Sequence, residues 1–344
     1  MYSLEELGWS ASWEAHYAPL RDLGEPARVC AQHRDGYRVL RPEGELRAET
    51  AGRLRHRGEE PAVGDWVVVH GGAIRAILPR RGALERRAAA DRNSPERFAA
   101  TQVMAANVDT VFILTSLNRD FSPRRLERYL ALAWDGGARP VVILTKADLC
   151  DDRAPRVAES EAVAPGVPVL PLSALTGDGL DALDPFLVPR TTVALVGSSG
   201  VGKSTLVNRL RGDDHMTVQQ IRLADDRGRH TTSHRELLPI RGGALLVDTP
   251  GLRELGFVDA EEGLERTFGD IEELARGCRF RDCTHSREPG CAVRGTVADD
   301  RLDAYLRLRR EMRFHARKES VQGMLAEKRR WRKLSRAIRR IKEE

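Results

Sequence analysis

The segment at residues 197–204, GSSGVGKS, is a complete phosphate-binding loop, and it constrains the fold more than any other part of the chain. An apolar run at 192–196 predicts a buried strand before the loop, and residues 205–210 predict a helix after it. Glycines in such a loop let backbone N–H groups turn onto phosphates, and the helix points its positive end at them. We therefore expect an α/β sheet that binds a nucleoside triphosphate.

The positions of this loop have separate expected roles. Lys203 would contact the β- and γ-phosphates, and the Ser204 hydroxyl would bind Mg²⁺. The residues expected to bind the phosphates are Gly197, Ser198, Ser199, Gly200, Val201, Gly202, Lys203, Ser204 and Thr205.

A second carboxylate near the metal is expected at the end of a neighbouring strand. Residues 244–247 predict such a strand, and it runs into Asp248, which would hold Mg²⁺ through water, while the N–H of Gly251 would sense the γ-phosphate. The polar stretch GRHTT at 228–232 would supply the threonine that closes onto Mg²⁺ in the triphosphate state. The sequence does not choose between Thr231 and Thr232.

The base-reading residues follow an apolar run at 141–144. The Asp148 carboxylate there could accept hydrogen bonds from the N1–H and 2-amino groups of guanine, and adenine offers neither donor. Lys146 would lay its aliphatic stem along the plane of the base. Guanine is therefore favoured over adenine.

A second loop would complete the base site. Ser173 and Ala174 follow a further strand-like run at 167–170. Thr145 stands where GTPases usually carry asparagine, so we expect one hydrogen bond that supports the base site to be weakened or rearranged.

These motifs stand in a permuted order. The base-reading residues precede the phosphate loop, whereas in an ordinary GTPase they follow it. Joining the ends of a GTPase domain and cutting it before the base-reading half gives this order, and an α/β sheet can survive such a cut because domain termini are often close together. The DTPG turn at 248–251 would then lead directly into the C-terminal part of the chain, and a nucleotide-dependent movement would pull on it.

The group that orients the attacking water is missing from its usual place. Many GTPases carry glutamine directly after the DxxG glycine, and this chain carries Leu252. Hydrolysis by the isolated protein should be slow. His230 is the internal candidate for this role, and an equally good alternative is that it only packs or caps its loop.

A metal site is predicted downstream. Cys278, Cys283, His285 and Cys291 have the spacing C-x4-C-x-H-x5-C, and three thiolates with one imidazole suit tetrahedral Zn²⁺ with no open position. Three of the five cysteines lie here, and no secretory segment is evident, so disulfides are not expected. The alternative is a loop with unpaired cysteines near a histidine.

Positive charge is concentrated at the C-terminal end. Residues 301–344 hold 16 basic and 6 acidic side chains, a net charge of +10, while the first 300 residues hold 40 and 45, a net charge of −5. Apolar side chains recur at helical spacing among these cations, which predicts a basic amphipathic helix for nucleic acid, a membrane surface or solvent. The zinc module beside it favours RNA. The apolar positions are Trp331, Leu334, Ile338 and Ile341.

The N-terminal third predicts a small β-barrel. Strand-like runs at 27–40, 45–54 and 65–78 are separated by turn signals. An oligonucleotide-binding (OB) barrel is the favoured type, and a purely structural barrel is the alternative. Residues 91–100 are the expected linker to the next domain. Phosphate contacts could be added by Arg80, Arg81, Arg86 and Arg87.

The chain resembles the RsgA family of circularly permuted GTPases over nearly its whole length. The resemblance rests on the permuted set TKAD, SAL, GSSGVGKS, GRHTT and DTPG, followed by CRFRDCTHSREPGC. It implies a multidomain fold with an N-terminal OB-type β-barrel, a circularly permuted P-loop GTPase α/β domain and a C-terminal helical zinc-binding domain. We expect an N-terminal extension at 1–24, the barrel at 25–90, the GTPase domain at 100–255 and the zinc domain with its basic tail at 256–344.

The resemblance also implies a function. Members hydrolyse GTP, bind the small ribosomal subunit late in its maturation and are stimulated by it. The implied ligands are GTP or GDP, Mg²⁺ and one Zn²⁺. The implied partners are the small subunit, its rRNA and other assembly factors, with no membrane, in a cytoplasmic and monomeric protein.

One function of a different class competes with this interpretation. A nucleotide-gated, zinc-containing RNA-binding protein would carry the same motifs, and its hydrolysis would be incidental. A P-loop ATPase or kinase conflicts with the guanine-reading carboxylate of Asp148.

Overall fold

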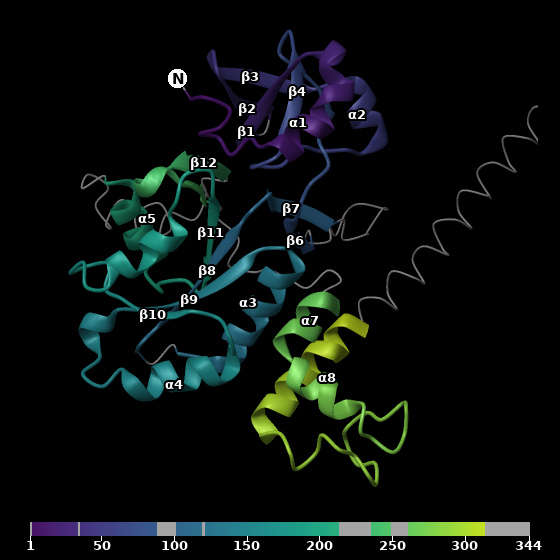
Figure 1. The fold of residues 1–344 in the computed structure, drawn as a ribbon, viewed down its shortest axis with the longest axis vertical. Coiled ribbons are helices and arrows are strands. Elements are labelled where there is room, and N and C mark those ends of the chain that lie inside the picture. Colours follow the sequence, from purple (N-terminus) through teal and green to yellow (C-terminus); the bar gives the residue numbers. More distant parts are fainter. Residues whose placement is uncertain are drawn as a thin grey trace, which may run out of the picture.

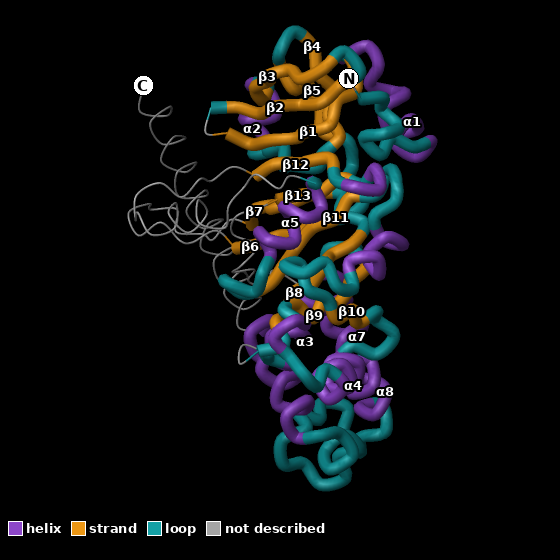
Figure 2. The backbone as a smooth tube through the Cα atoms, turned by 90° about the vertical axis from the view of Figure 1, so that its left-hand side faces the viewer, coloured by secondary structure: helices purple, strands orange, loops and turns teal. Residues whose placement is uncertain are grey.

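Most of the described strands join one continuous sheet. The structure is a computed structural model that describes residues 2–33, 35–87, 101–118, 121–212, 235–248 and 261–313. Among these residues, eleven strands run in the order β10-β9-β8-β11-β13-β12-β1-β2-β3-β5-β4, and Figure 2 shows them stacked along the long axis of the molecule. The barrel and the α/β domain are thus two parts of one hydrogen-bonded sheet.

The N-terminal strands close into a five-stranded barrel. The strand β4 pairs back onto β1, which completes the order β1-β2-β3-β5-β4, and a short helix, α2, lies between β3 and β4 in the sequence. The β3–β5 pair is parallel and the other pairs are antiparallel. The elements are β1 (Glu25–His33), β2 (Gly36–Arg41), β3 (Gly44–Thr50), α2 (Gly52–Arg57), β4 (Trp66–His70) and β5 (Ala73–Ile77).

The segment before the barrel packs on it. It contains helix α1 (Ala11–Tyr17) and the 3₁₀ helix η1 (Ala18–Leu23), and two tryptophans, Trp13 on α1 and Trp9 just before it, contact the ring of Trp66. Trp9 meets Trp66 edge to face at 4.6 Å between ring centroids, and Trp13 is 6.4 Å away. Buried aromatic pairs of this kind contribute about 0.5–1.5 kcal/mol beyond the area they bury. The extension is therefore part of the folded core.

The α/β domain has the permuted topology. The parallel strands are β10 (Val169–Pro171), β9 (Arg139–Thr145), β8 (Thr110–Ser116), β11 (Thr192–Gly197) and β13 (Leu245–Asp248), and the antiparallel β12 (Arg235–Pro239) follows β13 in the sheet. The phosphate-loop strand β11 lies at the centre, with β8 and β9, which precede it in the chain, on one side. The predicted permuted GTPase domain, preceded by a barrel, is confirmed.

Helices cover both faces of this sheet, and the sequence of each strand encodes the two faces. Alternate residues of β8 point in opposite directions: Val111 and Ile113 join the layer of α3 and α4, whereas Phe112 and Leu114 join that of α5. Burying each such side chain stabilises the fold by about 1.5–3 kcal/mol. The covering helices are α3 (Pro123–Asp135), α4 (Ala154–Val163), η3 (Leu180–Phe186) and α5 (Lys203–Arg211), and the short helices η2 (Ala147–Leu149) and η4 (Arg241–Gly243) follow strands.

A two-stranded hairpin connects the barrel to the α/β domain. The strands β6 (Ala83–Arg87) and β7 (Thr101–Ala106) pair antiparallel. The sequence did not predict this pairing. The whole of the expected linker at 91–100 lies outside the described residues.

The barrel and the α/β domain are joined by a buried arginine. Arg28, on β1, is 2% exposed, and its guanidinium donates to the Thr192 hydroxyl at the start of β11 (2.7 Å), the Gly64 carbonyl (3.3 Å) and the Leu7 carbonyl. Burial lowers the pKa of Arg28 to about 10, so the guanidinium stays protonated at neutral pH. One side chain thus connects the N-terminal extension, the barrel and the central strand.

A helical module packs on the α/β domain through α3. It contains α7 (Glu261–Thr267), α8 (Gly269–Ala275) and a helix over 299–313, and Figure 1 shows α7 beside α3. A Cβ added at Gly263 on α7 would lie 2.0 Å from the carbonyl oxygen of Ala131 on α3. The two helices approach this closely only because residue 263 has no side chain.

A buried ion pair lies in the same interface. Arg301 holds Asp270 through two hydrogen bonds of 2.8 Å, and its third contact reaches Glu127 on α3 at 3.3 Å. The Glu127 side chain is 4% exposed. Because Arg301 is already bound to Asp270, its attraction does not offset the burial of Glu127, and the pKa of Glu127 rises to about 7.

The Glu127 carboxyl should make the stability of this interface depend on pH. The pKa of Glu127 is higher in the folded than in the unfolded chain. Its contribution to the free energy of unfolding is therefore fully present below about pH 4.5 and is lost as pH rises through about 7. Glu127→Gln should remove up to about 3 kcal/mol of the pH dependence of the free energy of unfolding. The measurement is denaturant unfolding of both proteins at pH 5.5 and pH 8. Identical pH slopes for the two proteins would contradict this assignment.

Candidate nucleotide and metal sites

The phosphate loop follows β11 and has the backbone that its glycines allow. Gly197 has a φ of 150°, and a Cβ there would lie 2.5 Å from the carbonyl oxygen of Leu114 on the neighbouring strand. Helix α5 begins at Lys203, so the first turn of the helix follows the loop directly. The unpaired N–H groups of a first helical turn favour an anion in front of them.

The Lys203 side chain folds back onto the phosphate loop. The Lys203 ammonium donates to the carbonyl oxygens of Gly197 (2.7 Å) and Ser198 (2.5 Å), and the residue is half-buried. Ser204 and Thr205, also half-buried, occupy the first turn of α5 beside it. The cation and the hydroxyl groups therefore stand at the end of the central strand, as the sequence predicts.

The base-reading segment lies at the same edge of the sheet. Thr145 ends β9, Lys146 has a left-handed φ of 60°, and Asp148 follows in η2 with its side chain exposed. Asp148 makes no hydrogen bond or ion pair with the part of the chain that the structure describes. Its carboxylate is available to a ligand.

The loop with Ser173 and Ala174 is fixed to this segment by its backbone. The Ala147 N–H donates to the Leu172 carbonyl at 3.2 Å, and the buried Ser173 hydroxyl accepts from the Thr176 N–H at 3.2 Å. The two predicted base-reading loops are therefore adjacent.

The threonine that replaces the usual asparagine connects the base site to the phosphate loop. The Thr145 hydroxyl, buried at 1% exposure, donates to the Val201 carbonyl of the phosphate loop at 2.6 Å. It also lies 3.4 Å from the Thr115 carbonyl. The Thr145 hydroxyl therefore links the end of β9 to the phosphate loop.

A second connection, which the sequence did not reveal, comes from α5. The Arg209 guanidinium donates to the carbonyl oxygens of Ala174 (3.0 Å) and Leu175 (2.9 Å). The helix that carries Lys203 thus also holds the serine-alanine loop. A lone arginine late in a helix gives no sequence signal for this role.

The metal-side residues are only partly described. Asp248 ends β13, whose parallel register with β11 (Ala194 opposite Val247) brings it to the edge where the phosphate loop begins. Gly251, His230, Thr231, Thr232 and Leu252 lie outside the described residues. Their expected roles remain predictions.

A separate cavity of about 790 Å³ lies on the barrel and has no residue of the nucleotide motifs in its lining. It is lined by Glu59, Glu60 and Arg80 among others, and Arg80 is paired with the buried Asp65 through hydrogen bonds of 2.8 and 2.7 Å. Two carboxylates and a neutralised cation do not suit a nucleotide phosphate.

Two of the four arginines predicted to contact phosphate make contacts within the fold. Arg80 is held by Asp65, and the Arg81 guanidinium lies 4.6 Å from the centroid of the Trp13 ring and donates to the Ser10 hydroxyl at 2.7 Å. Charge in the sequence does not show which cations the fold has already neutralised. The side chains of Arg86 and Arg87 are outside the description.

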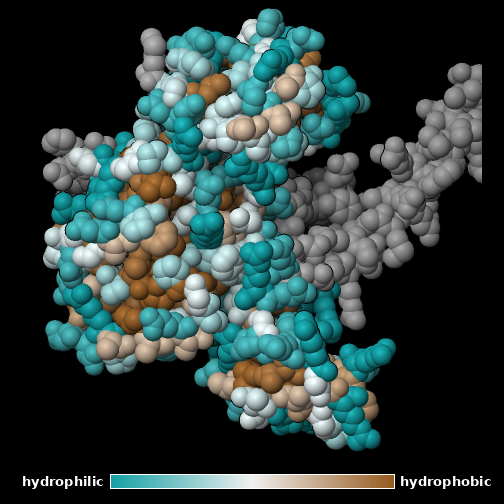
Figure 3. All heavy atoms as spheres, in the orientation of Figure 1, coloured by the Kyte–Doolittle hydropathy of each residue, from teal (hydrophilic) through white to brown (hydrophobic). Residues whose placement is uncertain are grey.

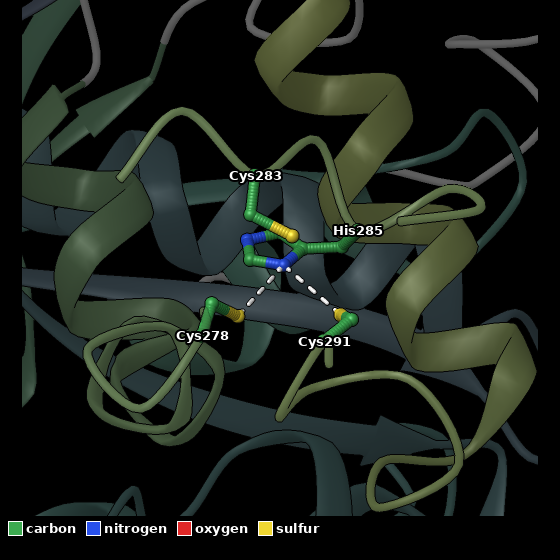
Figure 4. Close-up of side chains that lie close together, drawn as sticks. All are labelled: Cys278, Cys283, His285 and Cys291. Atoms are coloured by element: carbon green, nitrogen blue, oxygen red, sulfur yellow. Dashed lines mark hydrogen bonds between the residues drawn. The ribbon is translucent and has the colours of Figure 1, made fainter. Parts of the chain in front are cut away.

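The four predicted metal ligands converge on one point in the C-terminal module. The Nδ1 atom of His285 lies 3.6 Å from the sulfur of Cys278 and 3.5 Å from that of Cys291, and all four donor atoms, that of Cys283 included, fall within 4.8 Å of one another (Figure 4). Zn–S bonds of about 2.3 Å and Zn–N bonds of about 2.0–2.1 Å place N and S about 3.6 Å apart in a tetrahedral site. The donor set and its spacing fit a tetrahedral metal ion.

The surroundings prepare these groups to bind a metal ion. Burial, with a further contribution from Arg309, lowers the pKa of His285, so the imidazole is neutral and can bind a metal ion. The backbone N–H groups of Ala292 and Arg294 donate to the sulfurs of Cys278 (3.3 Å) and Cys291 (3.4 Å). Such bonds favour thiolates.

Glu288 organises the loop between the last two ligands. Its carboxylate accepts hydrogen bonds from the N–H groups of Thr284 (3.0 Å), Ser286 (2.9 Å) and Arg287 (3.0 Å), and from the Thr284 hydroxyl. These bonds, with that to the Thr284 hydroxyl the largest, lower the pKa of Glu288 to about 2. The sequence did not single this residue out.

Fold and site together define a circularly permuted P-loop GTPase. The family model of the RsgA GTPase matches residues 77–258, just over half of the chain. The protein belongs to the RsgA family.

Curated relatives and solved structures match this chain over most of its length. The chain is 48% identical over 301 residues to the small ribosomal subunit biogenesis GTPase RsgA 2 of Lactiplantibacillus plantarum, with 83% of each chain covered. It is 45% identical to the RsgA of Opitutus terrae, with 96% of each covered. The solved structure of YjeQ from Thermotoga maritima matches with a TM-score of 0.60 at 26% identity, and the match covers 83% of this chain and 98% of that one. The structure of YloQ, described as a circularly permuted GTPase, matches with a TM-score of 0.58 at 27% identity, and the match covers 84% of this chain and 94% of that one. In the described part of the chain, no helix has the length and apolar character needed to cross a membrane.

The Thr145 hydroxyl should matter for nucleotide affinity. Thr145→Val keeps the shape of the side chain but leaves the buried Val201 carbonyl without its donor. The loss should be about 1–2 kcal/mol, a roughly 5- to 30-fold weaker binding of GDP in a fluorescence titration. Thr145→Ser keeps the hydroxyl and should bind nearly as the parent does. Equal affinities for the valine and serine variants would show that the hydrogen bond does not support the site.

The metal should hold the C-terminal module together. Cys283→Ser should lose the bound metal and destabilise the residues after 255, because a structural site contributes much of the folding free energy of a small module. Metal content by mass spectrometry is the primary readout, and nucleotide binding should persist because that site has a separate core. Cys150→Ser, which changes a cysteine outside the cluster, should keep the metal. Full metal occupancy in Cys283→Ser would reject the ligand set.

Proposed function

We propose that this protein hydrolyses GTP, binds the small ribosomal subunit in its late maturation and is stimulated by that subunit. The observation that carries the proposal is the convergence of the phosphate loop, the guanine-reading loops and Asp248 at one edge of a permuted sheet, in a chain of the RsgA family. Relatives that are 42–48% identical are named small ribosomal subunit biogenesis GTPases. A guanine nucleotide and Mg²⁺ follow from membership of a GTPase family.

The proposed roles follow the geometry of the described residues. Lys203 binds the β- and γ-phosphates, Ser204 holds Mg²⁺ and Asp148 reads guanine. When bound, Mg²⁺ neutralises charge on the phosphates. Lys203, which now contacts the loop carbonyls, would exchange them for phosphate oxygens, which are stronger acceptors because they are charged. Thr145 and Arg209 hold the two halves of the site in register.

The remaining catalytic roles rest on the sequence. We assign the γ-phosphate contact to Gly251, the Mg²⁺-binding threonine to Thr231 or Thr232, and the orientation of the attacking water to His230. Leu252 has no polar group with which to orient water, and so the stimulating group comes from His230 or from the ribosomal partner.

We further propose that the metal is Zn²⁺ and that the barrel is of the OB type. Three thiolates and one imidazole form a closed tetrahedral set, which is typical of structural zinc. The closed five-stranded order with a short helix between the third and fourth strands supports the OB assignment. The proposed domains are the extension at 1–24, the barrel at 25–90, the GTPase domain at 100–255 and the zinc domain with its basic tail at 256–344.

The proposed partners are the small subunit, its rRNA and other assembly factors. The protein is proposed to bind them as a monomer in the cytoplasm. Residues 314–344 of the basic segment at 301–344, Trp331 among them, lie outside the described residues. The proposed contact of this segment with RNA rests on the sequence: its charge, its amphipathic spacing and the metal module that precedes it.

GTP turnover with and without purified small subunits tests the function. We expect about tenfold or greater stimulation by small subunits and none by large subunits, because the partner supplies or orders a missing group. Lys203→Ala should lose both the basal and the stimulated rate. Absence of stimulation by small subunits would support instead a nucleotide-gated RNA-binding protein whose hydrolysis is incidental.

A further inference from the structure

An aromatic side chain projects from the metal-binding loop. Phe280 lies between the ligands Cys278 and Cys283, and it is 41% exposed although it is one of the most apolar residue types. Neighbouring apolar side chains of the module, such as Phe268 and Val293, are fully buried. The Phe280 ring therefore lies outside the hydrophobic core of the module.

The segment that carries the ring is rich in arginines without acidic partners. The segment 276–294 holds five arginines and two acidic residues, Asp282 and Glu288. Glu288 is used by hydrogen bonds within its own loop. All five arginines are exposed, and none has a carboxylate oxygen within 4.0 Å among the described residues. They are Arg276, Arg279, Arg281, Arg287 and Arg294.

Many other arginines in the described part of the chain are neutralised by a carboxylate. Arg80 and Arg301 are paired with carboxylates within 3.0 Å, as are exposed arginines such as Arg190. The metal loop thus combines several unneutralised positive charges with one exposed ring. It lies at the end of the molecule farthest from the barrel, where hydrophilic residues dominate the surface with apolar atoms among them (Figures 1 and 3).

The loop holds the ring in a defined place. The Cys283 N–H donates to the Phe280 carbonyl at 3.3 Å, and the Arg279 N–H donates to the Gly290 carbonyl at 3.1 Å. A Cβ at Gly290 would lie 3.0 Å from that of Arg279, so the glycine lets the two limbs of the loop pack together. A metal bound by Cys278 and Cys283 would close the loop on both sides of the ring, and little entropy would then be lost when a ligand covers it.

We propose that Phe280 stacks on an unpaired base of RNA while the arginines around it bind the adjacent phosphates. Sequence-tolerant recognition of single-stranded RNA combines aromatic rings with cations in this way, and a base in a duplex offers no free face. The Arg279 guanidinium lies over the ring, 5.6 Å from its centroid, so in this proposal the base stacks on the opposite face and Arg279 binds a phosphate of the adjacent backbone. The proposal rests on the proposed function, since the small subunit supplies the RNA.

Matched substitutions of Phe280 test the stacking. Phe280→Leu keeps an apolar side chain but removes the aromatic face, and Phe280→Trp keeps the face. The full-length, metal-loaded proteins are titrated with a 12-nucleotide single-stranded RNA and with a fully paired hairpin of the same composition. Phe280→Leu should bind the single strand about 5- to 100-fold more weakly, as expected for one stacked base, whereas Phe280→Trp should retain the affinity. Affinity for the hairpin, metal content and GDP affinity should not change.

The salt dependence of RNA binding tests the contribution of the arginines. Arg281→Gln should flatten the salt dependence of single-strand binding by about 0.7 in the logarithmic slope, because one phosphate contact is lost. Phe280→Leu should leave that slope unchanged. The affinity of Phe280→Leu therefore reports the stacking contact, and the salt slope of Arg281→Gln reports the phosphate contact.

Two results would overturn the inference. If Phe280→Leu binds the single strand as well as the parent does, no base stacks on the ring. If it binds every RNA as the parent does but loses affinity for the small subunit, the ring contacts a ribosomal protein. In both cases the parent protein would still be stimulated by small subunits, whereas failure of the proposed function would abolish stimulation in the parent itself.

Discussion

The hydrogen bonding of one edge strand determines how the two N-terminal parts of this protein are joined. The strand β12 is paired with β13 on one side, and on the other its backbone groups would face solvent if the α/β domain stood alone. Such an edge invites unwanted pairing. The barrel strand β1 covers it, with Ala31 opposite Glu236, and an ion pair of 2.8 Å between Arg38 and Glu236 reinforces the junction. One side of β1 is therefore divided between β4 of the barrel and β12 of the α/β domain.

The same junction relates the barrel to the nucleotide site. The strand β12 leads through η4 into β13, which ends at Asp248, and Arg28 of the barrel is hydrogen-bonded to Thr192 at the start of the phosphate-loop strand. On the opposite flank, α3 connects β8 to β9 and receives the metal module through Gly263 and Arg301. Both flanking modules thus contact elements that begin or end at the nucleotide-binding strands.

Much of this architecture was predictable from the sequence, because local patterns determine it. The strand, loop and helix around Lys203 and the four metal ligands are contiguous or nearly so, and turn signals such as Gly71-Gly72 fall between the observed barrel strands. The run predicted at 45–54 is only partly a strand, since residues 52–57 form α2, in which Leu54 is the buried residue.

The unpredicted features depend on partners distant in the sequence. The sequence shows that Arg28 is basic but not that it reaches Thr192, 164 residues away, and it does not show that Trp9 packs on Trp66. The Thr145–Val201 and Arg209–Ala174 hydrogen bonds are equally invisible, because a hydroxyl or a guanidinium in the sequence does not specify a carbonyl partner. For the switch residues near His230 and Gly251, only the sequence prediction stands.

The pairing of β1 with β12 also has a consequence for the order in which the protein can fold during synthesis. Glu236 follows its partner Ala31 by 205 residues, and ribosomes add roughly 5–20 residues per second. For about 10–40 s after β1 is synthesised, the strand that covers its edge does not yet exist. The barrel can close through β4 within that time, but the seam with the GTPase domain, and the Arg28 contact with Thr192, form only after most of the chain has left the ribosome.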